Sequence, residues 1–342
     1  MTTHDEKTVD AEPGLPATMT AWRQSAYGGP ETMSAARVEV PQPGRGEVLL
    51  RVRATALAAG DVKLMRGEPL VARVAFGLRR PKNPVRGIEV AGTVVGLGPE
   101  VAGLAVGDEV LGEVGLGGGL AEYAVSPAAR LVRRPPGLDP VVAATLPVSA
   151  VTAWQALERV GVTDGDRVLV LRATGGVGTF AVQLARLRGA EVHATCGAAN
   201  DELVRSLGAS RTFDYRKVDA AALPAGAYDV VVDIAGTAPL GVLLGLVREG
   251  GRVVLVSGEG DRFWGPLGRI AGAAVRGIGS KRTLTALAAS ADTAVLERLV
   301  ALADNGSLAP VIERTWPLAE AGAALAHVDS GRSAGKVVVT VS

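Results

Sequence analysis

The chain has 342 residues, which is longer than one compact core usually reaches, so we expect two domains. Its 36 basic and 35 acidic residues nearly cancel, which argues against a nucleic-acid-binding or polybasic membrane surface, and no apolar run approaches the roughly 20 residues of a transmembrane helix. The single cysteine excludes a disulfide framework and a thiolate-rich zinc site, and it fits the reducing cytoplasm.

The first 18 residues, MTTHDEKTVDAEPGLPAT, lack the apolar stretch of a signal peptide and predict a disordered tail. The next part of the chain, residues 19–148, is rich in glycine, proline and strand-like segments. Residues 47–54 alternate as a half-buried strand would, and residues 90–96 and 107–112 continue this character. We therefore expect a β-rich first domain.

Strand and helix units alternate from residue 149. A helix is expected at residues 150–160, and apolar strands are expected at residues 167–171, 191–195, 211–215, 229–233 and 252–257. Nearly unbroken Val, Leu and Ile content suits parallel strands covered by helices on both faces. The sequence predicts a doubly wound α/β domain over residues 149–284, after which residues 285–342 return to the first domain.

The sequence RATGGVG, residues 172–178, joins the first of these strands to a helix. Such a turn directs backbone N–H groups and the helix dipole at one spot, which suits a pyrophosphate. Ala173, Gly175 and Gly178 fit the dinucleotide fingerprint with alanine in place of its first glycine. Because the turn follows the first strand, we favour dinucleotide binding over a turn that serves helix packing alone.

Several segments resemble the medium-chain dehydrogenase/reductase superfamily, and together they cover nearly all of residues 19–342. They are PQPGRGEVL (41–49), DVKLMRGEP (61–69), GTVVG (92–96), GDEV (107–110), LP (146–147), TA (152–153), the glycine turn, LVRSLGA (203–209) and GKVVV (335–339). FGLRRPK (76–82) and GPLGR (265–269) resemble its zinc-free, quinone oxidoreductase-like branch. The resemblance implies a GroES-like catalytic domain, a Rossmann domain, a cleft between them and a homodimer.

Zinc-dependent relatives carry a cysteine and a histidine at two positions that can be checked directly. The cysteine precedes by three residues the Asp that matches Asp61, and the histidine precedes the Glu that matches Glu89. Here these positions hold Ala58 and Ile88, which cannot bind a metal, and Cys196 is the only cysteine. The sequence predicts no metal site.

The resemblance implies hydride transfer from NAD(P)H to a conjugated C=C bond, a quinone or a related carbonyl of a small apolar molecule. The developing enolate needs a donor. Lys63 is the leading candidate, unless it extends into solvent, and Asp61 either anchors its segment or supplies a proton. Tyr27 and Tyr123 are weaker candidates. Ala58 replaces an Asn of many zinc-free relatives, which keeps open a cofactor-binding protein with lost or non-redox activity.

The glycine turn assigns the pyrophosphate to Gly175, Gly176, Val177 and Gly178. The resemblance adds cofactor contacts from Thr152, Thr174, Thr195, Tyr215, Ala235, Ser257 and Lys336. Lys336 either faces the cleft or lies on the surface. The loop formed by Phe263 and Trp264 either covers the substrate or buries Trp264 at the domain junction.

Cofactor choice depends on the loop after the second strand. Gly197 and Ala199 stand where close relatives have a hydroxyl and an Arg that would hold a 2′-phosphate, yet the acid that marks an NAD site is also absent. The resemblance favours NADPH, with NADH as the alternative. Unless Arg205, Arg216, Lys217 or another group replaces the missing cation, we expect a preference below about tenfold.

Overall fold

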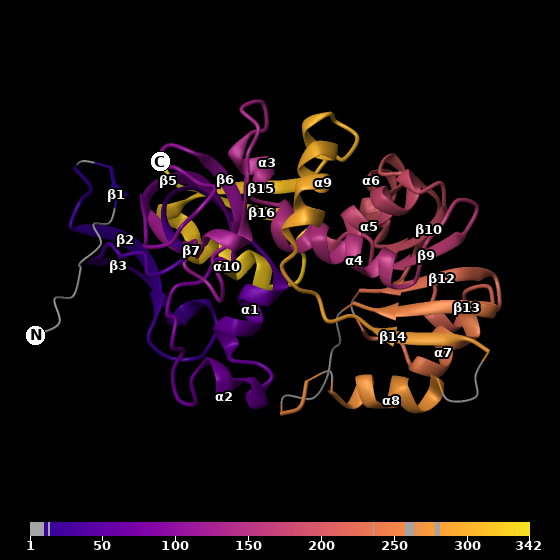
Figure 1. Ribbon diagram of the computed structural model, residues 1–342. Coiled ribbons are helices and arrows are strands. Elements are labelled where there is room, and N and C mark those ends of the chain that lie inside the picture. Colours follow the sequence, from indigo (N-terminus) through magenta and orange to yellow (C-terminus); the bar gives the residue numbers. More distant parts are fainter. Residues whose placement is uncertain (1–9, 13, 235, 257–262, 266, 278–280) are drawn as a thin grey trace, which may run out of the picture.

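The computed structural model describes residues 10–12, 14–234, 236–256, 263–265, 267–277 and 281–342. Its strands form two large sheets and one two-stranded sheet (Figure 1). The larger sheet takes strands from both ends of the chain, whereas the other large sheet is built from the middle of the chain. This arrangement confirms the expected fold class, a β-rich part combined with a parallel α/β part.

The first part of the fold contains ten strands: β1 (Asp10–Ala11), β2 (Thr18–Gln24), β3 (Met33–Glu39), β4 (Glu47–Leu57), β5 (Glu89–Leu97), β6 (Glu109–Glu113), β7 (Tyr123–Pro127), β8 (Leu131–Arg133), β15 (Ile312–Pro317) and β16 (Lys336–Thr340). Eight of them form a sheet in the order β15-β16-β4-β5-β6-β8, with β1 on β5 and β7 on β4. β2 and β3 form the small antiparallel sheet. The last strand, β16, pairs with β4, so the end of the chain completes a sheet begun near its start.

Residues 10–12, which the sequence analysis assigns to a disordered tail up to Thr18, are part of the fold. β1 pairs antiparallel with β5. The Glu12 carboxylate lies 2.8 Å from the Arg51 guanidinium, and β2 already begins at Thr18. The pairing uses backbone groups and one ion pair, so it leaves no hydrophobic pattern in the sequence.

The second sheet contains β9 (Arg167–Leu171), β10 (Glu191–Cys196), β11 (Ala209–Asp214), β12 (Tyr228–Asp233), β13 (Val247–Leu255) and β14 (Thr283–Ala286). All pairs are parallel, and the order is β11-β10-β9-β12-β13-β14. The order reverses between β9 and β12, where sheets of this type bind ligands at the carboxyl ends of the strands. The five predicted strands are present, β9 with its predicted ends and the other four with shifted ends, and the short β14 was not predicted.

The α-helices are α1 (Ala59–Arg66), α2 (Arg73–Phe76), α3 (Pro140–Ala143), α4 (Val151–Arg159), α5 (Gly176–Leu187), α6 (Asp201–Ser206), α7 (Leu240–Leu246), α8 (Leu267–Gly277), α9 (Thr293–Asp304) and α10 (Ala321–Asp329). Short helical turns lie at η1 (Pro30–Thr32), η2 (Leu70–Ala72), η3 (Ala128–Arg130), η4 (Leu146–Ala150), η5 (Ala198–Asn200), η6 (Ala220–Ala222) and η7 (Leu318–Glu320). Alternate residues of β9 enter different cores: Val168 packs in the cluster that contains α5, and Leu169 packs in the cluster that contains α7. Helices therefore cover both faces of the parallel sheet.

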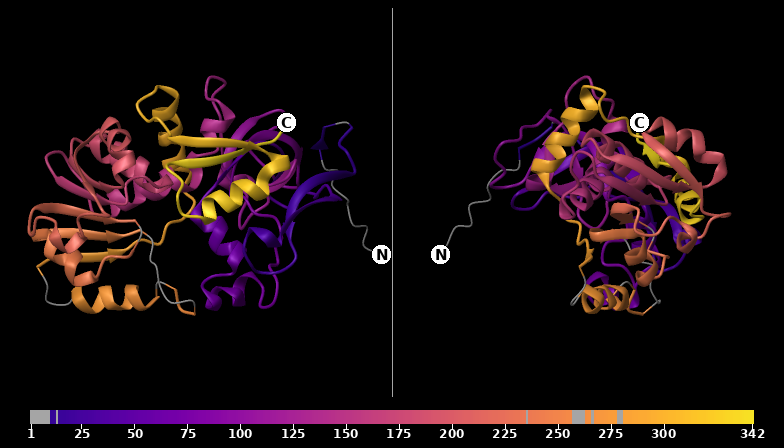
Figure 2. Two further views of the ribbon diagram at one scale, coloured as in Figure 1. Left: turned by 180° about the vertical axis from the view of Figure 1, so that it is seen from behind. Right: turned by 90° about the vertical axis from the view of Figure 1, so that its right-hand side faces the viewer.

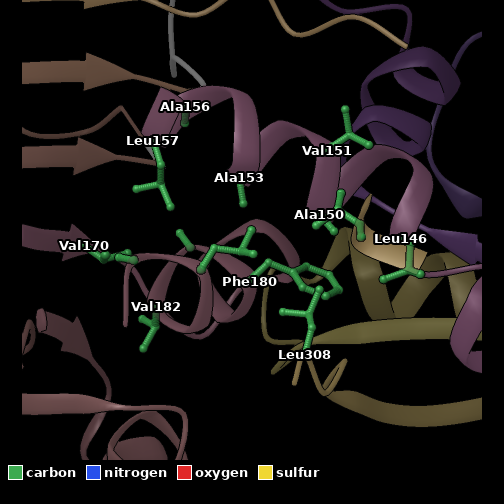
Figure 3. Close-up of a cluster of buried hydrophobic side chains, with 14 of the residues drawn as sticks. Leu146, Ala150, Val151, Ala153, Ala156, Leu157, Val170, Phe180, Val182 and Leu308 are labelled. Atoms are coloured by element: carbon green, nitrogen blue, oxygen red, sulfur yellow. The ribbon is translucent and has the colours of Figure 1, made fainter. Parts of the chain in front are cut away.

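One core cluster connects the two sheets. Leu146, Ala150 and Val151 lie around Phe180 of α5 (Figure 3), and the same cluster includes Ala54 of the larger sheet. The helical stretch Pro140–Arg159 is long and apolar enough to cross a membrane, with a mean hydropathy of 1.3, but 61% of it is buried inside the structure. Its apolar residues are therefore explained by its place in the core.

Candidate functional site

The glycine turn opens α5 at the carboxyl end of β9. Gly175 is the N-cap residue of α5. The first N–H groups of the helix have no intrahelical acceptor, and no side chain caps them. A Cβ atom on Gly178 would lie 2.7 Å from backbone atoms of Arg172 and Ala173, whereas a Cβ atom on Gly175 would meet nothing within 4 Å. The two interpretations of the turn thus apply to different glycines: Gly178 permits close packing, and Gly175 leaves open space at the helix N-terminus.

Lys336 lies on the inner side of this turn and is only 1% exposed, so the surface interpretation of this residue is wrong. Its Nζ forms an ion pair with Glu89 Oε1 and donates to Ser149 Oγ at 3.0 Å. A Cβ atom on Gly176 would lie 3.0 Å from Lys336 Cδ and 3.2 Å from Ser149 Oγ. The ammonium group therefore binds Glu89 and Ser149. Lys336 thus packs against the buried side of the turn and does not extend to its open side.

Glu89 is fully buried, and its second carboxylate oxygen accepts a hydrogen bond from the Val148 N–H at 3.0 Å. Burial raises the pKa of Glu89 to about 7, although the Lys336 ammonium and the Val148 N–H act against this rise. Our sequence analysis used Glu89 only to locate an absent zinc ligand. A sequence signal for its role as the partner of Lys336 does exist, because Glu89 is an acidic residue that begins an otherwise apolar strand.

Asp61 is buried in the first turn of α1, and backbone groups occupy both of its carboxylate oxygens. Oδ2 accepts from the Ala58 N–H at 3.0 Å, and Oδ1 accepts from the Gly87 N–H at 2.9 Å. Burial raises the pKa of Asp61. This geometry favours the anchor over the proton donor, because neither oxygen faces open space. Lys63 follows on the same helix and is exposed.

The two candidate tyrosines lie in other surroundings. The Tyr27 hydroxyl donates to the Gly77 carbonyl at 2.7 Å, and the Arg73 guanidinium lies 4.3 Å from the centre of its ring. Tyr123 is buried in β7 and lines a separate pocket together with Arg51. Both residues therefore tie loops and strands together, and neither lines the crevice at the parallel sheet.

A pocket of about 260 Å³ lies at the carboxyl ends of β9, β10 and β12, with Arg172, Thr195 and Tyr215 in its lining. Thr195 fixes the start of the glycine turn: its hydroxyl accepts from the Arg172 N–H at 2.8 Å, and its carbonyl accepts from the Ala173 N–H at 2.9 Å. The predicted Thr195 and Tyr215 thus meet beside the turn. The Thr174 carbonyl, also predicted, accepts from the Gly335 N–H at 2.7 Å and joins the turn to the segment before β16.

Arg172 is a pocket residue that our sequence analysis missed. Its φ of 59° is left-handed, and its guanidinium lies 5.5 Å from the centre of the Tyr215 ring, while that of Arg216 lies 5.8 Å from the same ring. Arg205, in contrast, pairs with Asp201 at 2.8 Å. Two cations therefore flank Tyr215, in a region where the sequence loop from Gly197 to Ala199 supplies none.

The acidic residues of the pocket lining are engaged with other groups. Asp219 accepts from the Ala221 N–H at 2.8 Å. Asp233 forms an ion pair of 2.6 Å with Arg269 and also accepts from the Gly236 N–H. These contacts reduce the repulsion that the two carboxylates would exert on a bound phosphate.

No group of three or more His, Cys, Asp or Glu side chains gathers within the part of the chain that the structure describes. Ile88 lies against α1, because a Cβ atom on Gly60 would be 3.8 Å from Ile88 Cδ1. Cys196 is buried, and burial raises the pKa of its thiol. The two positions that zinc-dependent relatives use for ligands thus hold apolar residues, Ala58 and Ile88.

The remaining predicted residues fall into two groups. Thr152 is buried on α4, and Ala235 and Ser257 lie outside the described residues. Phe263 and Trp264 are 65% and 60% exposed, so of the two alternatives for this loop, burial of Trp264 at the domain junction does not hold. The Phe263 carbonyl accepts from the Val71 N–H at 3.1 Å, which places this loop beside the catalytic part of the chain.

Comparisons with known proteins agree with this geometry. Residues 44–136 match the alcohol dehydrogenase GroES-like domain, and residues 207–339 match the family described as zinc-binding dehydrogenase. The chain is 37% identical over 335 residues to a chloroplast envelope quinone oxidoreductase homolog of Arabidopsis thaliana, covering 94% of this chain and 98% of that protein. It is 33% identical over 344 residues to an NADPH-dependent alkenal/one oxidoreductase of the same plant, covering 97% and 82%. The quinone oxidoreductase structure from Coxiella burnetii superposes with a TM-score of 0.84 at 27% identity, covering 95% of this chain and 100% of that one.

Proposed function

The chain belongs to the zinc-independent, quinone oxidoreductase-like branch of the medium-chain dehydrogenase/reductase superfamily, and from this premise we propose that it reduces enones, enals, quinones or related carbonyls of small apolar molecules with NAD(P)H. The observation that carries the proposal is the open helix N-terminus at Gly175 beside the crevice of the parallel sheet. Sheets of this type bind ligands at this point, which supports a backbone site for a dinucleotide there.

The described residues fit a nicotinamide dinucleotide. The N–H groups of Gly176, Val177 and Gly178 would hold its pyrophosphate, and the pocket beside Tyr215 would hold its adenosine. The cofactor supplies the hydride, so the protein has to position the reactants and stabilise charge. Lys336 and Glu89 would fix the turn from the inside while leaving its outer side open.

NADPH is the cofactor that the charges of the pocket favour. Arg172 and Arg216 flank Tyr215 and provide the positive charge that Gly197 and Ala199 lack. A charged hydrogen bond to a phosphate contributes about 1.5–3 kcal/mol, which is roughly tenfold or more in affinity. Without a replacement for the missing Arg, the preference for NADPH over NADH would stay below about tenfold. Because Arg172 and Arg216 can replace it, we expect a preference above about tenfold. The plant relative described as NADPH-dependent supports this choice.

Lys63 is the proposed donor to the substrate carbonyl, where negative charge develops during reduction. Lys63 is an exposed residue of α1, and Asp61 holds the first turn of that helix in place. Removing one donor to a developing oxyanion costs about 10²–10³ in kcat in known cases. A Lys63→Met variant should lose kcat while its affinity for NADPH stays unchanged, and Lys63→Arg should retain part of the activity.

The function is tested by following the oxidation of NADPH with a panel of enones, enals and quinones, and with saturated ketones for comparison. We expect turnover of the conjugated compounds. Calorimetry on the same sample measures cofactor binding independently. Tight binding without turnover across the panel would contradict the proposal. It would favour a cofactor-binding protein with lost or non-redox activity, in line with Ala58 in place of the Asn of many relatives.

A homodimer is part of the proposal. β14 ends the order of the parallel sheet, and an edge strand offers backbone groups for pairing with a second copy. Sedimentation measurements at several protein concentrations test the dimer. The Leu287 N–H donates to Leu255 of β13, so in this alternating strand the Ala286 N–H lies on the unpaired side of β14. An Ala286→Pro variant removes this donor and should weaken a dimer that pairs through the edge.

A further inference from the structure

Exposed apolar side chains are concentrated in two short segments. Of the eleven large hydrophobic side chains that are exposed among the described residues, seven lie within residues 71–78 and 263–270. Val74 and Leu78 are 73% and 70% exposed in the first segment, and Phe263 and Trp264 are 65% and 60% exposed in the second. Single exposed apolar residues are common on proteins, but a contiguous group marks an interaction surface.

The two segments are neighbours, although about 190 residues separate them in sequence. The Val71 N–H donates to the Phe263 carbonyl at 3.1 Å, and a Cβ atom on Gly265 would lie 2.8 Å from Pro69. Figure 1 and the left view of Figure 2 both show α2, residues 263–265 and α8 along the lower edge of the molecule. We call residues 71–78, 263–265 and 267–270 the apolar edge.

Basic residues surround the apolar edge. Residues 66–86 contain six Arg or Lys and one acidic residue, and residues 263–282 contain four Arg or Lys and no acidic residue, in a chain whose 36 basic residues face 35 acidic ones. Arg79, Arg80 and Lys82 are exposed directly beside Leu78. Arg66, Arg269 and Lys281 pair with carboxylates, and Arg86 is buried. The positive charge of this edge therefore comes mainly from Arg79, Arg80 and Lys82.

We propose that the apolar edge docks the protein on an anionic lipid bilayer. Its aliphatic and aromatic side chains would enter the boundary between headgroups and acyl chains, where Trp is enriched. Arg79, Arg80 and Lys82 would face the negative headgroups. A second copy of the chain suits this edge less, because two copies of the same positive surface repel each other.

This proposal departs from the expectation, drawn from the overall charge, that the protein has no membrane contact. The net charge of the chain hides a local excess of basic residues. This excess is recognised only in the fold, where the two segments lie side by side. The inference concerns adsorption to one leaflet, since Pro140–Arg159 belongs to the core. The inference does not depend on the proposed reaction, because its test measures only the binding of the protein to lipid vesicles.

Flotation of the full chain with vesicles tests the proposal. We expect binding to vesicles of phosphatidylcholine mixed with phosphatidylglycerol, at least tenfold weaker binding to phosphatidylcholine alone, and a loss of binding as salt increases. Arg79→Glu/Arg80→Glu and Leu78→Asp should each weaken binding at least tenfold. The matched controls, Arg159→Glu/Arg186→Glu and Leu187→Asp, change exposed residues of α4 and α5 and should bind like the wild type.

Trp264 provides a second measurement, because Trp22, Trp154 and Trp316 are half-buried or buried. Brominated lipid should quench the tryptophan fluorescence of the wild type on anionic vesicles, and a Trp264→Phe variant should lose this quenching. Three results would overturn the proposal: no binding to anionic vesicles, binding that the edge variants leave unchanged, or a dimer that Leu78→Asp dissociates. The last result would assign the edge to a second copy.

Discussion

The two ends of the candidate cofactor site are built in different ways. Backbone groups of residues 175–178 form the proposed pyrophosphate end, and the buried pair of Lys336 and Glu89 holds it from the inside. The exposed side chains of Arg172, Tyr215 and Arg216 form the proposed adenosine end. Packing fixes the first end, so changes there should affect folding and binding together. Changes at the second end should alter affinity and selectivity without a loss of stability.

The largest effect is expected from Lys336→Met. This change leaves the Glu89 carboxylate buried without its cation, and breaking a buried pair by removing one partner costs about 3–5 kcal/mol. The free energy of unfolding, measured with urea, should fall by this amount at about pH 8. Affinity for the cofactor should fall as well, because the side chain lies against Gly176.

The loss should depend on pH in a defined direction. The pKa of Glu89 rises from 4.5 to about 7 on folding, so between these values the folded state holds more protons than the unfolded state and stability falls as pH rises. Without Lys336 the pKa rises further, so the fall continues at higher pH, and the loss at about pH 5 should be smaller. The double variant Glu89→Gln/Lys336→Met should restore stability and remove this dependence. Equal losses at both pH values would contradict the role of Glu89.

A smaller loss of stability is expected from Gly178→Ala. The added methyl group would lie 2.7 Å from backbone atoms of Arg172 and Ala173, which cannot move aside as a flexible side chain can. Overpacking of this kind costs about 1–3 kcal/mol. Thermal unfolding of the variant measures the cost.

Gly175→Ala is the matched control, since its methyl group meets no protein atom within 4 Å. This variant should fold within about 1 kcal/mol of the wild type, the scale of an N-cap change. It should still lose at least about tenfold in cofactor affinity, because the methyl group enters the space proposed for the pyrophosphate. Unchanged affinity in a folded Gly175→Ala protein would remove the cofactor from this turn.

The same contrast explains how much of the molecule was predictable. Apolar runs and glycine spacing are local properties of the sequence, so they predicted β9 with its observed ends and the turn that opens α5. The role of Glu89 depends on Lys336, which is 247 residues away in sequence. The role of Arg172 depends on a left-handed backbone that directs its side chain toward Tyr215. Neither property can be predicted from the residues that are neighbours in sequence.

Selectivity between cofactors should change by a smaller amount when the adenosine end is altered. Arg172→Ala should lower the affinity for NADPH about tenfold and leave the affinity for NADH nearly unchanged, because only NADPH carries the 2′-phosphate. Dissociation constants from calorimetry measure both. Arg205→Ala is the control, since Arg205 pairs with Asp201 and should not affect either cofactor. Equal losses for both cofactors would show that Arg172 acts through the fold of the turn.

The smallest effect is expected from metal removal, which tests whether the first end is held by the ion pair alone. A zinc ion near Ala58 and Ile88 would draw on the Glu89 carboxylate and compete with Lys336, yet those two side chains offer no ligand atoms. Purified protein should contain less than one zinc per chain by elemental analysis, and treatment with a chelator should change neither activity nor stability. A stoichiometric metal whose loss lowers both would mean that Glu89 is shared with a metal. The turn would then be held by coordination, and the contrast between its two ends would need a different physical basis.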